Sequence, residues 1–387
     1  MWVDFVYKIF KIVFVVLFVC ALVYVDFIGK EVRSLKKKTK RYSHFLGSAA
    51  KGQFTPPFGK IVVPSPLQPL PFGEDSGLIL GVKDIVVRNV IAPYNATMIE
   101  DGEGYLLFFR YDLIQKKLPG NFVTYVGCAK LDSNFQQTAE EFRKIDTGSD
   151  FSEDPRVLTV GNSLYLVYND VHPTNHTCRT MRIGKFNLNE SKLEFVTDLD
   201  LQIKPVEKNW VPFEYVENGV PQFYLEYSLN PHKILKVEDP RVSAITHLIF
   251  PNFSLCHKFF WPSAWGEYVK GGSPAKKIGN AYLGFFHTFF VDEYKTAWYT
   301  MGAYTFEENP PFRINAVSHY PILYKGIYNS PPINTADPTK RVVFPGGFVE
   351  REIDGKKVIH LVCGENDCSI KVITFDKNLL LESMKKI

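Results

Sequence analysis

Carboxylate, amide and cationic side chains recur along this 387-residue chain directly after short apolar runs. The most highly charged example is residues 153–156, with the sequence Glu-Asp-Pro-Arg. Two adjacent carboxylates beside a guanidinium can separate their pKa values, so that one stays ionised and the other donates a proton. We therefore expect one of Glu153 and Asp154 to be ionised beside Arg156 and the other to have a raised pKa and donate a proton. The same tetrapeptide returns at residues 238–241, so the string alone does not mark a site.

A second grouping, residues 207–210, combines a carboxylate, a cation, an amide and an indole. Aromatic faces suit the apolar faces of sugar rings, while amides and charges bind hydroxyl groups. Lys208, Asn209 and Trp210 therefore predict a saccharide or phosphate site, and the alternative is a core tryptophan beside a solvated lysine. His287, after an apolar run, is either a functional group or a satisfied core histidine. No His or carboxylate pair has the spacing of metal ligands.

A phrase that occurs five times positions these residues: a proline, a short gap, a glycine, then an aromatic and aliphatic run. Its prolines are Pro93, Pro155, Pro212, Pro274 and Pro345. A second apolar phrase follows each first one, at residues 126–131, 181–186, 234–237, 301–306 and 369–375. Short runs rich in Val, Ile, Tyr and Phe, separated by Gly, Pro and Asn turns, favour antiparallel strands. Each unit offers about four strands, which predicts an all-β fold, a five-bladed β-propeller.

In a propeller the innermost strand of every blade lines a central channel, so polar residues at one place in the phrase gather at one mouth. The residues that we expect to bind substrate there are Asn95, Arg110, Glu153, Arg156, Asn209, Trp210 and Asp367.

The first 29 residues form a separate element. Residues 12–25 are uncharged and almost wholly apolar, and the stretch from 9 to 29 is long enough to cross a bilayer. We predict a signal anchor over 1–29, a basic and Pro-rich stem over 30–78, and the propeller over 79–387. The alternative is a cleaved signal peptide, for which residues 19–21 offer a cleavage site.

The orientation signals disagree. Basic residues after the apolar segment outnumber those before it, which places the body in the cytoplasm. Four glycosylation sequons, at Asn95, Asn175, Asn189 and Asn252, indicate the lumen instead. We expect a single-pass membrane protein with a lumenal body in the secretory pathway, because an anchor, a stem and a catalytic body are the usual plan of a glycan enzyme there.

Net charge bears on the class of ligand, and the cysteines bear on the stability of the fold. A net charge of +4 is too small and too dispersed to predict nucleic-acid binding. Cys363 and Cys368 flank a turn, and they either form a local disulfide or stay buried as small apolar residues.

The ordered set of motifs resembles glycoside hydrolase family 130, five-bladed propellers that cleave β-mannosides, mostly by phosphorolysis. The resemblance covers about residues 85–385, and its strength is the order of the motifs. They are Asn95-Ala96, residues 153–156, 182–184, 207–210, 271–274 with 282–287, and 344–347 with 365–367. The resemblance implies that Asp154 is the general acid, acting through a mannose hydroxyl, and that Arg182, Lys208 and His287 bind inorganic phosphate.

One departure from the family bears on the reaction. The phosphorylases carry a second phosphate-binding arginine soon after the first, and the stretch around Asp198 and Asp200 supplies none. Losing half of a bidentate anion clamp removes geometry as well as charge.

Three functions remain open. The first is cleavage or transfer of β-linked mannosyl residues of a glycan, without a cofactor and with inorganic phosphate or a sugar nucleotide as a possible co-substrate. The second is a membrane-anchored mannosyltransferase that uses a sugar nucleotide, like relatives of this family in trypanosomatids. The third is a non-catalytic glycan-binding propeller, against which the retained Asp154, Arg182, Lys208 and His287 argue.

Overall fold

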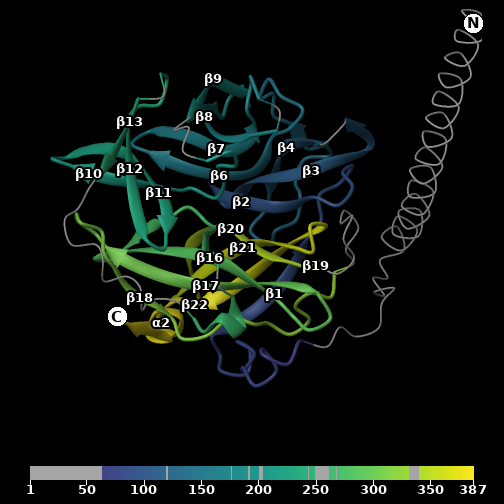
Figure 1. The fold of residues 1–387 in the computed structure, drawn as a ribbon, viewed down its shortest axis with the longest axis vertical. Helices are drawn as coiled ribbons and strands as arrows, with labels where there is room; N and C mark the ends of the chain where they lie inside the picture. Colours follow the sequence, from purple (N-terminus) through teal and green to yellow (C-terminus); the bar gives the residue numbers. More distant parts are fainter. Residues whose placement is uncertain are drawn as a thin grey trace, which may run out of the picture. The chain divides into compact units, whose positions relative to one another are not determined.

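The computed structural model describes residues 63–387 except 119–120, 176, 191, 200–203, 243, 249–260, 267 and 331–339. The predicted anchor, the stem up to residue 62, and the positions of Asp200 and Asn252 lie outside the described residues. No helix in the described part of the chain is long and apolar enough to span a membrane. The described residues are mostly β-strand (Figure 1).

Four of the sheets have four antiparallel strands each. The first contains β2 (Tyr94–Asp101), β3 (Gly104–Leu118), β4 (Asn121–Leu131) and β5 (Arg143–Lys144). The second contains β6 (Glu153–Val160), β7 (Ser163–Val171), β8 (Arg179–Asn187) and β9 (Lys192–Leu199). The third contains β10 (Val211–Glu217), β11 (Val220–Leu229), β12 (His232–Asp239) and β13 (Ala244–Leu248). The last contains β20 (Val343–Ile353), β21 (Lys356–Glu365), β22 (Ser369–Asp376) and β1 (Ile79–Ile85).

The remaining sheet has seven strands and lies between the third and the last in chain order. Its strands are β14 (Lys270–Gly271), β15 (Lys276–Ile278), β16 (Ala281–Val291), β17 (Ala297–Glu307), β18 (Ile314–Ser318), β19 (Lys340–Arg341) and β23 (Met384–Lys386). Both apolar phrases of every repeat are strands, as predicted, because their β-branched and aromatic residues favour strands, and in β7, β16 and β21 nearly every side chain of the phrase is buried.

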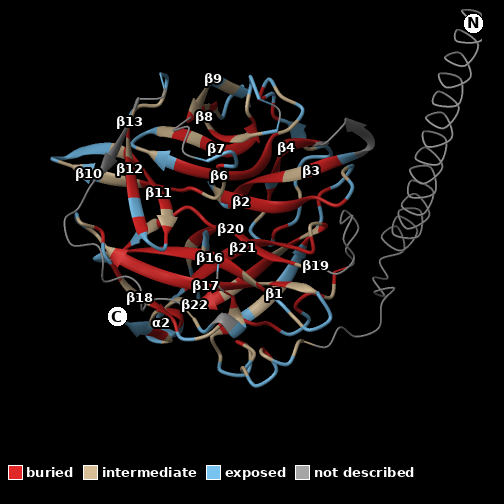
Figure 2. Ribbon diagram, in the orientation of Figure 1, coloured by how far each residue is buried: buried red, intermediate tan, exposed pale blue. Residues whose placement is uncertain are grey.

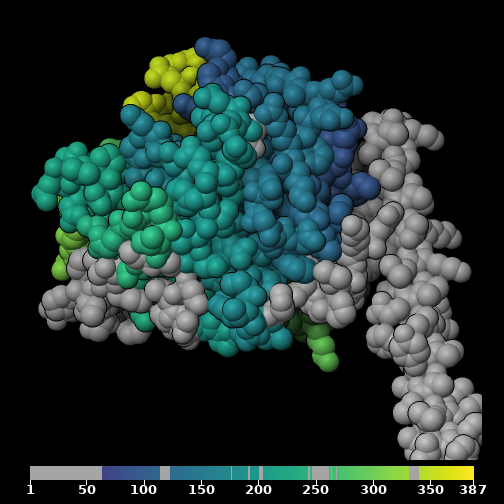
Figure 3. Space-filling model, turned by 90° about the horizontal axis from the view of Figure 1, so that it is seen from above, coloured from purple at the N-terminus to yellow at the C-terminus, as the bar shows by residue number. Residues whose placement is uncertain are grey.

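Neighbouring sheets contact each other mainly through their first strands. β2 contacts β6 and β20, β6 contacts β10, β11 contacts β14, and β16 contacts β20. Each sheet thus has two neighbours, and the described chain has an all-β, propeller-like fold. Buried residues follow these inner strands (Figure 2). In the view of Figure 3 the first three sheets, in blue to teal, form a continuous surface, and C-terminal residues lie at one edge.

The last sheet is closed by the N-terminal end of the described body. The sequence after the last apolar phrase predicts a short helix over 378–386, and β22 is indeed followed by a helix, α2 (Lys377–Glu382), whose N-cap is Asp376. Its fourth strand is instead β1, which pairs with β22 from Ile79↔Phe375 to Ile85↔Ile370. Joining the two ends of the body in one sheet leaves no open edge between them.

Residues 63–78, which the sequence analysis assigned to the stem, are part of the folded body. Leu67 has no exposed surface and belongs to the core of the seven-stranded sheet. Trp265 Nε1 donates to the Pro66 carbonyl at 3.1 Å, and Gly73 N donates to the Leu323 carbonyl at 2.8 Å. The end of the Pro-rich segment therefore does not mark the start of the folded domain, because apolar side chains within this segment pack into the core.

The inner strands approach each other closely at one point. A Cβ atom added to Gly346 of β20 would lie 2.0 Å from the Ala96 carbonyl oxygen of β2, so only glycine fits there. Cys363 of β21 and Cys368, in the turn before β22, are buried and are not joined by a disulfide.

Candidate active site

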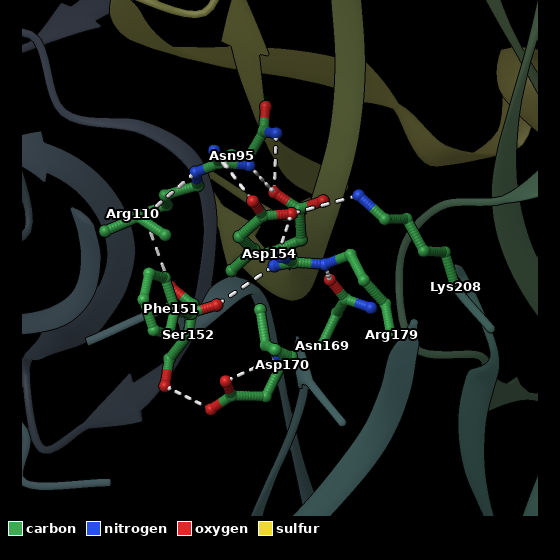
Figure 4. A network of polar contacts seen from close by, with 12 residues as sticks. Asn95, Arg110, Phe151, Ser152, Asp154, Asn169, Asp170, Arg179 and Lys208 are labelled. Atoms are coloured by element: carbon green, nitrogen blue, oxygen red, sulfur yellow. Dashed lines mark hydrogen bonds and ion pairs between the residues drawn. The ribbon is translucent and has the colours of Figure 1, made fainter. Parts of the chain in front are cut away.

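Two β-bulges turn Asn95 and Asp154 toward each other. The β2–β3 register shifts between Tyr94 and Thr97, and the β6–β7 register shifts between Glu153 and Arg156. Asn95 and Asp154 have left-handed backbones, with φ of 46° and 52°, which short polar residues tolerate best. A bulge redirects one side chain out of the regular alternation. Asn95 Nδ2 consequently donates to Asp154 Oδ1 at 2.8 Å (Figure 4).

Arg110, near the end of the straight part of β3, joins the two carboxylates. Its NH1 lies 3.3 Å from Asp154 Oδ1 and its NH2 lies 3.2 Å from Glu153 Oε1. Its Nε donates to Asp112 Oδ1 at 3.2 Å and to Thr124 Oγ1 at 3.1 Å. The planar guanidinium therefore has acceptors on three sides, which fixes its position.

Glu153 has two further cationic partners. Arg179 NH2 lies 2.9 Å from Glu153 Oε2, and Lys208 Nζ lies 3.0 Å from the same atom. The Arg179 side chain is 12% exposed, whereas that of Lys208 is 34% exposed. Solvent therefore reaches the cluster from the side of Lys208, between the second and third sheets. We call Asn95, Arg110, Glu153, Asp154, Arg179 and Lys208 the carboxylate cluster.

Both carboxylates of this cluster are ionised. Burial favours the neutral form of Asp154, but Arg110 and Lys208, with the amide of Asn95, hold its pKa well below the usual range. Burial also acts on Glu153, and Arg110 and Lys208 again outweigh it and lower its pKa. The expectation that one carboxylate has a raised pKa is therefore wrong for the unliganded chain. In this state Asp154 can accept a proton or a hydrogen bond.

Arg156 does not pair with the carboxylates. Its Nε donates to the Gly272 carbonyl at 2.7 Å, and NH2 donates to the Gly271 carbonyl at 3.3 Å and to Asn209 Oδ1 at 3.1 Å. Its NH1 donates to the backbone carbonyl of Asp154 at 3.2 Å. Arg156 is fully buried, and burial lowers its pKa to about 10. Arg156 therefore links the second sheet to the start of the seven-stranded sheet, and its bond to the Asp154 carbonyl helps to fix the backbone of Asp154.

Trp210 lies in the hydrophobic core and presents no face to a ligand. It has no exposed surface, and its ring packs edge-on against Tyr227 with centroids 5.3 Å apart. Its Nε1 donates to Glu207 Oε2 at 3.3 Å, and Tyr227 Oη donates to Glu207 Oε1 at 3.0 Å. The alternative prediction, that Trp210 is a core residue, is confirmed, and its buried ring does not support a role in substrate binding.

Arg182 is held in a different network. Its Nε lies 2.6 Å from Asp198 Oδ1 and its NH1 lies 3.0 Å from Asp170 Oδ2. Asp170 is fully buried and also accepts from Ser149 and Ser152. Asp198, in the stretch where the phosphorylases have their second arginine, is thus a counter-ion of Arg182. Two carboxylates already occupy the guanidinium that was expected to bind phosphate.

His287 lies near the cluster but is neutral. Burial and the neighbouring Arg156 lower its pKa to about 3. Its ring packs on Phe344 at 4.8 Å and on Tyr299 at 6.1 Å. A neutral imidazole can exchange hydrogen bonds with a ligand but attracts an anion weakly.

Asp367 lies on the far side of Tyr94. It accepts from Lys340 Nζ at 3.3 Å, and its charge contributes to the raised pKa of Tyr94, which is mainly an effect of burial. Tyr94 Oη donates to Asp112 Oδ2 at 2.9 Å, and the Tyr94 ring lies 4.8 Å from the Arg110 guanidinium. Asp367 therefore belongs to the rim of the carboxylate cluster.

The sequence analysis missed Arg179. Besides Glu153, it contacts Asn169 Oδ1 at 2.6 Å through Nε and the Phe151 carbonyl at 2.9 Å (Figure 4). Its position in the sequence could have identified it. Arg179 is the first residue of β8 and pairs with the end of β7, at the end of the sheet where the polar residues gather. The second Glu-Asp-Pro-Arg string lies at the surface, where Arg241 NH2 is 2.9 Å from Asp239 Oδ2 and Lys236 Nζ is 3.5 Å from Glu238 Oε2.

The described residues contain no group of three His, Cys, Asp or Glu side chains arranged to hold a metal ion. What the cluster presents is a pair of buried carboxylates, three cations and an amide at one solvent-accessible point. Such a group suits a neutral polyhydroxylated ligand, which can donate to Asp154 and accept from Lys208.

The fold is similar to solved structures of carbohydrate-active enzymes. One, from the GH130 family of mannoside phosphorylases and of hydrolases that target β-1,2 mannosidic linkages in Candida mannan, is 15% identical with a TM-score of 0.54, covering 82% of this chain and 97% of that one. A mannose phosphorylase from Leishmania mexicana, in complex with phosphate, is 15% identical with a TM-score of 0.53, covering 81% and 93%. A β-1,2-mannobiose phosphorylase from Listeria innocua, in complex with mannobiose, is 17% identical with a TM-score of 0.51, covering 80% and 97%.

No protein-family model and no curated protein matches the sequence. At these identities the structural similarity establishes a shared fold. The assignment of an activity to this chain depends on its own residues, chiefly the carboxylate cluster.

Proposed function

We propose that this chain is a carbohydrate-active enzyme that cleaves or transfers β-linked mannosyl residues of glycans. In this proposal the fold is a five-bladed propeller in which the seven-stranded sheet is an enlarged fourth blade. The carboxylate cluster is the observation that carries the proposal. Asn95 of β2 and Arg110 of β3 converge on Asp154, which is buried, ionised and held in a left-handed bulge of β6. A strained, charged residue at a junction of inner strands is typical of catalytic positions.

Asp154 is proposed to exchange a proton with a hydroxyl group of the bound sugar or acceptor. As a carboxylate it takes the proton of an attacking hydroxyl, which is general-base catalysis. To act as an acid in bond cleavage, it first has to gain a proton as substrate displaces water and draws Lys208 away. Lys208 is the most exposed cation of the cluster and is suited to bind a sugar hydroxyl or a leaving group.

Transfer from a sugar nucleotide is the second candidate, and a specific observation counts against inorganic phosphate as a co-substrate. Arg182 is occupied by Asp170 and Asp198, and His287 is neutral, so two of the three expected phosphate ligands lack free positive charge. An ionised Asp154 also suits activation of an acceptor hydroxyl. Phosphate as a co-substrate is therefore the less supported option.

We further propose a single-pass membrane protein whose body lies in the lumen of the secretory pathway, with the anchor over 1–29 as the link to the membrane. Asn95 cannot carry a glycan in the folded body, because it is 5% exposed and bonded to Asp154. Asn175 is exposed on the β7–β8 connection. A mobility shift on glycosidase treatment that becomes smaller in Asn175→Gln is the expected result, and no shift in any sample points to a cytoplasmic body.

The test of the activity is a direct comparison of donors. The purified chain is incubated with β-mannobiose with and without inorganic phosphate, and with GDP-mannose plus a mannoside acceptor. Phosphate-dependent release of mannose 1-phosphate would contradict the transferase candidate, whereas GDP release that requires the acceptor supports it. Mannose release without phosphate identifies a hydrolase.

The matched variant is Asp154→Asn, which keeps the shape and the contact with Arg110 but cannot take a proton. We expect turnover to fall by about 10²–10⁴-fold while sugar binding remains. If turnover survives this change, Asp154 is not the catalytic residue. If the wild type binds oligosaccharides but turns over none of the donors, the chain is a glycan-binding propeller.

A further inference from the structure

A groove of about 1010 Å³ lies beside the tip of the β16–β17 hairpin. It is lined by residues 63–66 and 68 and by the aromatic side chains of Tyr268, Phe289, Tyr294 and Trp298. Tyr268 is 58% exposed and Tyr294 is 78% exposed, which is unusual for large side chains that gather at one place. Clustered exposed aromatic surface marks a binding site more often than bare surface does.

An uninterrupted row of side chains connects this groove with the carboxylate cluster. The guanidinium of Arg156, which supports Asp154, lies 5.5 Å from the Phe344 ring, and this ring lies 4.8 Å from His287. The row continues outward through Tyr299.

Three stacked contacts form the outer part of the row. His287 and Tyr299 are stacked with centroids 6.1 Å apart, Tyr299 and Phe289 at 5.3 Å, and Phe289 and Tyr268 at 5.4 Å. His287 and Phe289 are two residues apart on β16 and so lie on one face of the sheet.

The groove and the cluster also lie at the same end of the sheets. Asp154 lies near the start of β6 and Asn169 lies near the end of β7, so the site is at the end of the sheet where the first strand begins and the second strand ends. β16 is the corresponding second strand, and its last residues continue past His287 into the hairpin tip, paired with β17 up to Val291↔Ala297. The hairpin therefore rises beside the mouth that contains Asp154.

The chemistry of the lining suits a neutral oligosaccharide. Tyr268 is stacked on Phe289 and still more than half exposed, so it offers ring surface to the C–H face of a sugar. Asp292 is occupied by the backbone of Tyr294 and Thr296 and by Trp298 Nε1. Glu293 is exposed, and the described residues that line the groove include no lysine or arginine to attract an acidic ligand.

The geometry points to a second sugar-binding site in this groove, which holds the outer residues of a neutral oligosaccharide whose reacting residue lies at Asp154. This inference rests on the proposed function and names its substrate class, an oligosaccharide longer than a disaccharide. Tyr268 is the central residue of the site, because it is both supported by Phe289 and open to solvent.

The experiment compares two substrates in one variant. The ratio of kcat/KM for β-mannotetraose to that for β-mannobiose is measured in the wild-type chain, in Tyr268→Ala and in the matched control Tyr268→Phe, which keeps the ring. We expect Tyr268→Ala to lower kcat/KM for the tetrasaccharide by roughly threefold to tenfold, the range for loss of one aromatic contact, and to leave the disaccharide unchanged. Tyr268→Phe is expected to behave as the wild type.

A second readout does not depend on turnover. Binding of β-mannotetraose is titrated calorimetrically in Asp154→Asn and in Asp154→Asn with Tyr268→Ala, and weaker binding in the double variant supports the groove even if no mannoside is turned over. Equal effects on both substrates, or unchanged binding, overturn the inference. A lower Tm of Tyr268→Ala without a change in selectivity also overturns it and indicates that a protein segment covers the groove.

Discussion

Replacing Arg110 with methionine removes the cation that joins Glu153 and Asp154 while keeping most of the side-chain volume. In the folded chain Arg110 lies within 3.3 Å of three carboxylates, those of Asp112, Glu153 and Asp154, and its side chain is 12% exposed. At an effective dielectric constant of about 20, each pair contributes an attraction of about 5 kcal/mol. Burial of the charges offsets most of this attraction in the intact cluster.

The variant loses the attraction but keeps the buried carboxylates. Removing one partner of a buried ion pair typically costs about 3–5 kcal/mol, because the other charge stays desolvated. We expect a loss of this size in the free energy of unfolding of Arg110→Met at pH 7.5. Glu153 retains Arg179 and Lys208, so most of the cost arises at Asp154, whose remaining direct partner is the amide of Asn95.

The loss in the free energy of unfolding of Arg110→Met is expected to depend on pH. In the wild type the pKa of Asp154 lies below its unfolded value, so the stabilisation by pairing is fully present at neutral pH and is lost as the pH falls through the folded pKa. In Arg110→Met, burial raises the pKa of Asp154, and protonation relieves the desolvated charge as the pH falls. Each pKa unit of this rise reduces the difference between variant and wild type by about 1.4 kcal/mol at low pH.

Urea unfolding followed by tryptophan fluorescence at pH 7.5 and pH 4.5 measures this difference. Arg241→Met is the matched control, because Arg241 occupies the same tetrapeptide but pairs with Asp239 on the surface, and we expect no measurable change in it. Arg110→Met in the Asp154→Asn background is expected to cost much less than in the wild type. A loss that is equal at both pH values, or equal in both backgrounds, would refute the assignment of Arg110 as the counter-ion of Asp154.

Three further predictions follow from single contacts. Asp198→Ala frees one side of Arg182 and is expected to tighten inorganic phosphate binding by about tenfold in calorimetry; unchanged affinity means that Arg182 does not face a ligand. Leu67→Ala is expected to destabilise the body by about 2–5 kcal/mol in urea, a result that a flexible stem would not give. Trp210→Phe leaves Glu207 short of a donor and is expected to cost about 1–3 kcal/mol in stability while sugar affinity stays constant; a selective loss of affinity would return Trp210 to the site.

The strands were the most predictable part of this protein. Each apolar phrase became a strand because the strand preference of its β-branched and aromatic residues, and its flanking turns, act over a few residues; each sheet then pairs mostly neighbours in sequence. β1 was not predictable as the partner of β22, because that pairing joins residues almost 300 positions apart and depends on how the body closes. The packing of Leu67 depends on the same long-range contact.

The site was predictable in part. The polar positions after the phrases indicated Asn95, Arg110, Glu153, Asp154 and Lys208, which do converge. Residue type alone does not say whether a side chain enters a core, and so Trp210 was assigned to the substrate.

The sequence by itself determined the strands, the repeat and the set of charged residues at the ends of the strands, because these depend on local periodicity and turn chemistry. Only the tertiary structure decided which charges meet. Arg110 neutralises Asp154, Asp198 neutralises Arg182, and burial keeps His287 neutral. The ionisation of these side chains depends on distances of a few ångströms between charges on different strands and sheets, and on how far packing removes water from the charges. Neither quantity can be deduced from the sequence alone.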